Sequence, residues 1–295
     1  MNGKGQAVMR DSVEVGGRPR TYTVVGPADG KPSRDLVLVF HGSRQTGEKH
    51  RKFTGKAFDA LADGGAAVVV YLDGHEGNWN DARRASRFPA RRENIDDVGF
   101  TRAVTEKLVA SHRIDPGRVF AIGYSNGGQM VMRLAHEAPE LIAGAAVLAA
   151  TMPAPENFLV AGAPSVPMPV LLVHGTKDPI IGYAGGELSW WARKLFKIGG
   201  RSLSIPETAA YFAARNGITD EPVSRTLPKR AGSAGGTSAE RTDYRQQGRP
   251  PVTLLTVHGG GHTIPGPRRA PAVLGRTSQD VNTADLVAEF FELSR

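Results

Sequence analysis

The sequence contains no cysteine, so neither disulfide bridges nor thiolate-bound metal sites can serve this chain. It also lacks an apolar run long enough to cross a bilayer, because the longest, Leu141–Met152, falls short of the roughly 20 residues that a membrane helix needs. The first thirty residues have no apolar core of the signal-peptide type. These absences predict a soluble protein without a membrane partner, cytoplasmic unless a leader was removed before residue 1.

Acidic residues are outnumbered, 29 against 37 lysines and arginines, which gives a formal charge of +8. Five of the ten residues from Arg83 to Arg92 are arginine. No basic run carries the interleaved aromatic side chains of a nucleic-acid platform, so no nucleic-acid partner is predicted. Two interpretations of the arginine cluster stay open: a solvated surface, or a basic rim that attracts carboxylate-bearing or polymeric anionic substrates.

What the sequence does contain is typical of one large globular unit, since 40% of its 295 residues are hydrophobic and 22% are charged. No repeat and no Ser/Gly/Pro linker divides it. We therefore expect a loose tail over residues 1–10 and a single domain over 11–295, with a lid insertion near 183–203 as an open alternative.

Apolar runs typical of buried strands alternate with helical patterns, which predicts a mostly parallel central sheet flanked by helices, an α/β fold. The N-terminal segments Ser12–Val15 and Thr21–Val25 form a predicted antiparallel hairpin around Gly16-Gly17. Residues 221–249 are polar and are expected to be irregular, with one edge strand near Arg241–Arg245. The predicted buried strands are Leu36–Phe40, Ala66–Leu72, 119–124, Ala145–Ala150, Pro169–His174 and Val252–Val257, and the predicted helices are Lys49–Ala62, Asp96–His112, Gln129–His136, 205–215 and Asp280–Leu293.

The stretch Val119–Gly128, VFAIGYSNGG, joins a predicted strand to a predicted helix through Gly-x-Ser-x-Gly. A sharp strand-to-helix turn with glycines on both sides of a serine is the pattern of a nucleophile elbow. The glycines are needed because a Cβ at either neighbouring position would clash. The pattern predicts Ser125 as a nucleophile. One alternative is a glycine-rich turn that serves only tight packing. A second, a turn that holds a phosphate, is disfavoured because the stretch lacks the Gly-Lys-Ser/Thr ending of a phosphate loop.

A serine nucleophile needs a histidine base and an orienting carboxylate, and in this architecture they follow the serine in the order acid, then histidine. Of eight histidines, His258 and His262 come after a suitable acid. His262 is the predicted base because it lies beyond three glycines in a loop, whereas His258 is expected to end a strand. Asp178, in the loop after Pro169–His174, is the predicted acid. A plain turn role before Pro179 is the alternative.

Two backbone N–H groups, of Ser43 and Asn126, are expected to bind the oxyanion, since both follow strands that end at the same sheet edge. Aromatic residues near that edge are candidates for the substrate pocket. Trp190-Trp191 lie in a helical pattern, Leu188–Phe196, for which core packing and a lid are both open. The expected substrate-binding residues are Trp79, His41, Tyr124 and Trp191, with His41 as a hydrogen-bonding residue and not a base.

Several motifs in one order give the chain a family resemblance, from about Tyr22 to Gly266. They are VFHGSRQTG, VVVYLDG followed by NWNDAR, IDDVGF, VFAIGYSNGGQM, HGTKDPIIGY, PETAAYFAARNG and GGGHTIPG. With these motifs the chain resembles the polyhydroxybutyrate-depolymerase and feruloyl-esterase type of bacterial α/β-hydrolase. The resemblance implies Ser125, Asp178 and His262 as the triad, Ser43 and Asn126 as the oxyanion hole, and Trp79 as a pocket residue. Many relatives carry cysteine after the His-Gly pair, where this chain has Ser43.

The resulting hypothesis is a serine carboxylic-ester hydrolase that works through an acyl-enzyme, with neither metal nor cofactor. The resemblance suggests aryl esters of the feruloyl kind or short 3-hydroxyalkanoate oligomers as substrates, small or oligomeric. Two alternatives stay open: an acyltransferase or peptidase with the same triad, and a non-catalytic binding protein with a hydrolase fold. The oligomeric state is not predicted.

Overall fold

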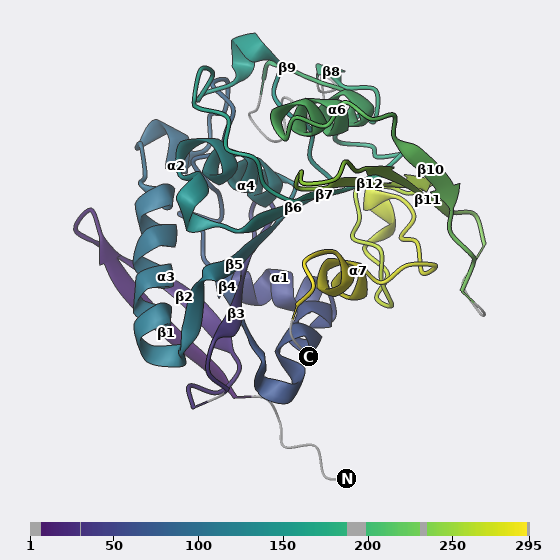
Figure 1. Cartoon of the computed structure of the whole chain (residues 1–295). Coiled ribbons are helices and arrows are strands. Elements are labelled where there is room, and N and C mark those ends of the chain that lie inside the picture. Colours follow the sequence, from purple (N-terminus) through teal and green to yellow (C-terminus); the bar gives the residue numbers. More distant parts are fainter. Residues whose placement is uncertain (1–6, 30, 188–198, 231–234, 294–295) are drawn as a thin grey trace.

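A computed structural model describes residues 7–29, 31–187, 199–230 and 235–293 of the chain. Over these residues the centre of the molecule is a ten-stranded sheet in the order β1-β2-β4-β3-β5-β6-β7-β12-β11-β10 (Figure 1). The strands from β4 to β12 in this order pair in parallel, and antiparallel strands extend the sheet at both edges. The expected mostly parallel sheet flanked by helices is confirmed.

The parallel strands are buried along nearly their whole length, as their continuous apolar runs predict. The strands are β1 Val8–Val15, β2 Arg18–Val25, β3 Arg34–Phe40, β4 Ala67–Leu72, β5 Ile114–Tyr124, β6 Gly144–Leu148, β7 Val170–Gly175, β10 Val223–Thr226, β11 Ser238–Tyr244 and β12 Val252–His258, with a separate pair, β8 Gly186–Glu187 and β9 Arg201–Ser202.

Helices cover both faces of the sheet (Figure 1). On one face α3, α4 and α6 pack their apolar side chains on the sheet, and on the other α7 and the 3₁₀ helix η1 do so. The helices are α1 Gly47–Phe53, η1 Ala57–Gly65, α2 Pro89–Arg92, α3 Asp97–His112, α4 Asn126–Glu137, η2 Pro139–Leu141, η3 Pro155–Asn157, α6 Ile205–Arg215, η4 Ala272–Leu274 and α7 Thr283–Phe290. No described helix has the length and apolar character that a bilayer crossing requires.

The N-terminal hairpin forms as expected, with Gly16 and Gly17 both at positive φ between β1 and β2. The prediction of one continuous helix over Lys49–Ala62 is wrong, because the segment is interrupted in its middle. The chain leaves the helix after α1, because Gly55 and Lys56 adopt φ of 66° and 63°, and it resumes as η1.

The expectation of an irregular segment over residues 221–249 is also wrong in part. β10 and β11 form an antiparallel pair that extends the sheet beyond β12. All four residues of β10 are exposed, and its sequence, VSRT, has no alternation of apolar and polar residues that would predict a strand. Pairing with β11 stabilises it instead.

Candidate active site

Ser125 lies in the sharp turn between β5 and α4, at the carboxyl edge of the sheet. Its backbone has φ 55° and ψ −114°, which is unusual for a residue with a side chain. The flanking glycines allow the turn. A Cβ on Gly123 would lie 2.2 Å from the carbonyl oxygen of Gly127, and one on Gly127 would lie 2.1 Å from that of Phe40. The backbone therefore requires glycine at both positions.

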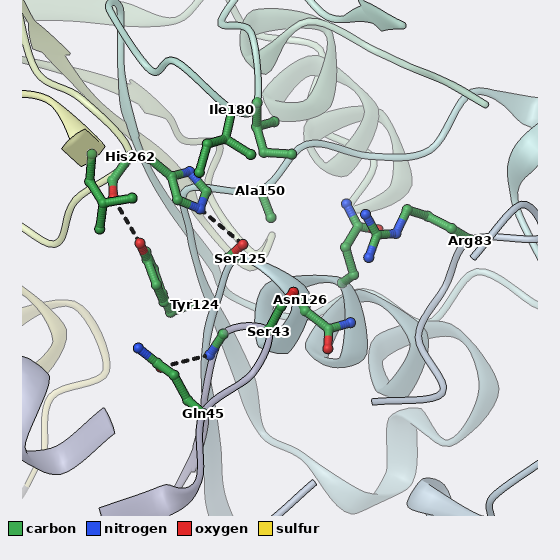
Figure 2. Close-up of a pocket in the computed structure, with 13 residues that line it drawn as sticks. Ser43, Gln45, Arg83, Tyr124, Ser125, Asn126, Ala150, Ile180 and His262 are labelled. Atoms are coloured by element: carbon green, nitrogen blue, oxygen red, sulfur yellow. Dashed lines mark hydrogen bonds between the residues drawn. The ribbon is translucent and has the colours of Figure 1, made fainter. Parts of the chain in front are cut away.

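Three side chains from three loops of this edge form a continuous hydrogen-bonded chain. The Oγ of Ser125 is 2.9 Å from Nε2 of His262, and Nδ1 of His262 is 2.7 Å from Oδ2 of Asp178 (Figure 2 shows the first pair). A carboxylate can only accept, so Nδ1 carries the ring proton and Nε2 is left to accept the proton of the serine hydroxyl. Geometrically, this is the arrangement that a serine nucleophile needs.

The side chain of Asp178 is buried and held from several sides. Its Oδ1 accepts hydrogen bonds from the N–H groups of Ile180 and Ile181, both 2.8 Å, and its Oδ2 faces His262. Nε2 of His174 lies 3.5 Å from the same Oδ2. Burial alone would raise the pKa of Asp178, but His262, His174 and the N–H of Ile180 together hold the pKa below its ordinary value. The carboxylate stays ionised and keeps the ring oriented.

The loop that carries His262 is fixed to two other segments. The hydroxyl of Tyr124 donates to the carbonyl oxygen of His262 at 2.7 Å, and the N–H of His262 donates to the carbonyl oxygen of Leu274 at 2.7 Å. His258, the other candidate base, ends β12 with its side chain exposed, 3.2 Å from Glu240. It lies outside the hydrogen-bonded chain.

The N–H groups of Ser43 and Asn126 belong to the same cavity as Ser125 and donate to no other described residue. The Asn126 N–H is in the first turn of α4, where backbone donors have no partner inside the helix. The Asn126 side chain is locked, since its Oδ1 accepts from the N–H of Trp79 at 2.9 Å and its Nδ2 donates to Asp81 at 2.6 Å. That these two N–H groups bind a developing oxyanion stays a prediction.

Two expected substrate-binding residues, Trp79 and His41, do not line the cavity in the structure. Trp79 is fully buried and donates its indole N–H to the carbonyl oxygen of His41 at 2.9 Å. Nε2 of His41 accepts from the N–H of Gly74 at 2.9 Å, and burial lowers the pKa of His41 to about 4. Both residues support the loop that carries Ser43. Trp191, the third expected pocket residue, lies outside the described residues.

The cavity around Ser125 has a volume of about 120 Å³, and Tyr124 lines it as expected. Several lining residues were not predicted. Gln129 follows Ser125 by four positions, a helical spacing that signals a shared face. Ile180 and Ile181 come from the loop after β7 and Leu274 from η4, and no local pattern predicts that these segments reach the cavity. The described lining residues are Gly42, Ser43, Gln45, Arg83, Tyr124, Ser125, Asn126, Gln129, Ala150, Ile180, Ile181, His262 and Leu274.

The arginine cluster is partly built into the fold. Arg83 forms a buried ion pair with Asp81, Arg84 donates Nε to the carbonyl oxygen of Phe158 at 2.8 Å, and Arg91 donates to the carbonyl oxygens of Asp81 and Arg83. Arg83 is thus buried and Arg91 half-buried, whereas Arg84, Arg87 and Arg92 are exposed, as the solvated-surface interpretation expects. The basic rim that attracts anionic substrates stays a prediction.

One group of side chains in the described part of the chain gathers possible metal-ligating atoms, those of His75, Glu76 and Glu93, within 4.8 Å of one another. Glu93 already forms an ion pair with the exposed Arg18 at 2.9 Å. The group does not line the cavity around Ser125.

Comparison with known proteins matches residues 65–196 to the family model described as phospholipase/carboxylesterase. The chain is 35% identical over 290 residues to the putative esterase NocK of Nocardia uniformis subsp. tsuyamanensis, covering 94% of this chain and 80% of that protein. It is 28% identical over 236 residues to feruloyl esterase B of Piromyces equi, covering 79% of this chain and 40% of that protein. The second match thus leaves more than half of that relative unmatched.

Among solved structures, acetyl xylan esterase from Aspergillus awamori superposes with a TM-score of 0.58 at 15% identity, covering 97% of this chain and all of that one. A dienelactone hydrolase-like promiscuous phosphotriesterase from metagenomic libraries gives 0.57 at 14% identity, covering 98% of each chain. These likenesses show the α/β-hydrolase fold. The predicted resemblance to feruloyl esterases is confirmed, and the polyhydroxybutyrate-depolymerase part of it stays a prediction.

Proposed function

The chain belongs to a family of esterases with the α/β-hydrolase fold, and we propose that it is a serine carboxylic-ester hydrolase that works through an acyl-enzyme. The observation that carries the proposal is the continuous chain from the hydroxyl of Ser125 through the ring of His262 to the carboxylate of Asp178, at 2.9 and 2.7 Å. In the proposed reaction the serine hydroxyl is activated because it is hydrogen-bonded to a base, which a carboxylate orients in turn.

In the proposed acylation, Oγ of Ser125 attacks the ester carbonyl carbon while Nε2 of His262 takes the hydroxyl proton. The carbonyl oxygen becomes an oxyanion and accepts hydrogen bonds from the N–H groups of Ser43 and Asn126. Asp178 stabilises the imidazolium that forms. Collapse breaks the bond to the leaving alcohol, which takes its proton from Nε2 of His262, and leaves the acyl group on Ser125.

Deacylation repeats these roles with water. Nε2 of His262 takes a proton from the water as its oxygen attacks the acyl carbon, and the same two N–H groups hold the second oxyanion. His262 then returns the proton to Oγ of Ser125 as the acid leaves. Each oxyanion donor is expected to contribute about 10²–10³ in kcat.

Two substrate classes follow from the resemblance: aryl esters of the feruloyl kind and short 3-hydroxyalkanoate esters. The relative named feruloyl esterase B supports the aryl esters. The relative named putative esterase NocK favours neither class. The test is hydrolysis of p-nitrophenyl acetate, p-nitrophenyl butyrate and methyl ferulate by wild type and Ser125→Ala. We expect turnover by wild type and a loss of about 10⁴–10⁶-fold in the variant. Turnover that survives in Ser125→Ala would refute the proposal.

Two alternatives keep the same three residues: an enzyme that transfers the acyl group to an alcohol or an amine, and a binding protein that catalyses no reaction. Hydrolysis in the presence of added alcohol or amine separates these outcomes, because an acyltransferase transfers the acyl group to the added acceptor while an ester hydrolase delivers it to water. Reaction with a fluorophosphonate probe, mapped to Ser125 by mass spectrometry, tests for an activated serine. A chain that neither labels nor turns over ester would be a binding protein with a hydrolase fold.

A further inference from the structure

An ester bound at Ser125 has an acyl half and an alcohol half, and the geometry of the site assigns each half to one side of the cavity. Figure 2 shows His262 and Arg83 on opposite sides of Ser125. The leaving alcohol of the proposed reaction must face His262, because the ring protonates it. The acyl half then extends toward Arg83, and the lining side chains beside His262 contact the alcohol half.

The lining side chains beside His262 are apolar. Ile180 and Ile181 lie two and three residues after Asp178, and their N–H groups both donate to its Oδ1 at 2.8 Å. Leu274 belongs to η4, and its carbonyl oxygen accepts from the N–H of His262 at 2.7 Å. The side chains of all three residues line the cavity. They carry no polar atom, so this wall offers contact surface and no hydrogen bond.

This apolar wall is fixed before an ester binds. The N–H of Gly261 donates to the carbonyl oxygen of Arg276 at 2.9 Å, which holds the segment after η4 against the loop of His262. The two segments touch so closely that a Cβ on Gly261 would lie 2.1 Å from the carbonyl oxygen of Leu274. Ile180 and Leu274 are only half-buried, so part of each side chain is open for a ligand to cover. Covering it with an apolar group is favourable, because apolar surface leaves water.

We propose that Ile180, Ile181 and Leu274 form a subsite for an apolar alcohol, which makes esters of short aliphatic alcohols the preferred substrates; this inference rests on the proposed esterase function. Each methylene of the alcohol that the subsite covers is expected to raise kcat/KM by about 2–4-fold. The hydroxyl groups of a sugar or glycol would lose water and find no hydrogen-bond partner on these three side chains, so such alcohols are disfavoured. The cavity of about 120 Å³ limits the length of the alcohol.

The test compares kcat/KM for butyl acetate and 2-methoxyethyl acetate, each below its solubility limit. Both esters form the same acyl-enzyme, so a difference in kcat/KM comes from the alcohol half. The 2-methoxyethyl group has the shape of butyl with an ether oxygen in place of one methylene, and this oxygen makes it the better leaving group. We nevertheless expect kcat/KM of wild type to be about 5–20-fold higher for butyl acetate.

Variants of the subsite test whether it causes this preference. Leu274→Asn keeps the size of the side chain and makes it polar, and we expect it to lower the ratio of butyl to 2-methoxyethyl acetate about threefold or more. Ile180→Asn is expected to act in the same way, which covers a failure of the first variant to fold. Leu274→Met stays apolar and is expected to keep the ratio within about twofold of wild type. The matched control is Leu227→Asn, because Leu227 is also half-buried but does not line the cavity, so the ratio holds.

A wild-type ratio near 1 or below, or a ratio that Leu274→Asn and Ile180→Asn leave unchanged, overturns the inference. Methyl pentanoate, an isomer of butyl acetate with the added carbons on the acyl half, shows which half the subsite contacts. A fall in the ratio of methyl pentanoate to methyl acetate in Leu274→Asn, without a fall in the first ratio, overturns the inference too. Failure of the esterase proposal is distinguishable, because wild type would then leave p-nitrophenyl acetate and all of the alkyl esters intact.

Discussion

Ser125 adopts a backbone conformation that costs a residue with a side chain of the order of 1–3 kcal/mol. Contacts on both sides maintain it: its N–H donates to the carbonyl oxygen of Leu148 at 2.8 Å, and its carbonyl oxygen accepts from the N–H of Gln129 at 3.1 Å. Oγ is therefore held within 2.9 Å of Nε2 of His262 before any substrate arrives. In the proposed reaction such positioning lowers the barrier, because the two groups need no reorganisation.

A matched pair of variants tests which of the two candidate bases, His258 or His262, activates Ser125. His262→Gln removes the proposed base, and we expect kcat for p-nitrophenyl acetate to fall by about 10⁴–10⁶-fold. His258→Gln changes an exposed side chain that pairs with Glu240, and we expect kcat within about twofold of wild type. Comparable losses in both variants, or a loss in His258→Gln alone, would transfer the base role away from His262.

At the scale of elements, β5, the turn and α4 act as one unit that depends on close backbone approach. Gly127 packs against β3, and a Cβ there would meet the carbonyl oxygen of Phe40 at 2.1 Å. A backbone oxygen in a buried strand cannot move aside without disturbing the sheet. The position of Ser125, the proposed nucleophile, thus depends on a contact between two strands and a helix terminus.

We therefore expect Gly127→Ala to lower the free energy of unfolding by about 3 kcal/mol or more, or to prevent folding. Urea unfolding followed by circular dichroism measures it. The matched control is Gly235→Ala, where an added Cβ meets no atom of the described residues within 4 Å and the expected change is within about 0.5 kcal/mol. Equal midpoints for the two variants would show that the turn tolerates a side chain.

The whole molecule buries several histidines in neutral form. Burial lowers the pKa of His50 to about 3, and of His41 and His136 to about 4. In the unfolded chain a histidine titrates near about 6.5, so between these values the unfolded state binds more protons. The contribution of the buried neutral histidines to the free energy of unfolding is complete above about pH 6.5 and is lost as the pH falls toward 4.

Between pH 6.5 and 5.5 each such histidine is expected to lower the free energy of unfolding by about 1 kcal/mol, or about 3 kcal/mol for three. Urea unfolding at pH 6.5 and 5.5 measures this loss. His136→Gln removes one titrating group and is expected to reduce the loss over this interval by about 1 kcal/mol. Equal unfolding free energies at the two pH values would mean that these rings are protonated in the folded protein.

The sequence by itself determined the strands of the parallel sheet, the elbow at Ser125 and the order in which Asp178 and His262 follow it. These inferences succeed because continuous apolar runs, helical spacing and the requirement for glycine are properties of short segments. The two interrupting residues of the first helix, Gly55 and Lys56, were missed, since a left-handed lysine has no local signal.

Only the tertiary structure decided which side chains reach the cavity. Trp79 lies in a loop of the correct edge, yet its indole points into the core, because its N–H finds the carbonyl oxygen of His41 there. Arg83 reaches the cavity from the arginine cluster because Asp81, buried beneath the elbow, holds it. Side-chain direction depends on partners that are distant in sequence, and those partners meet only once the sheet has formed.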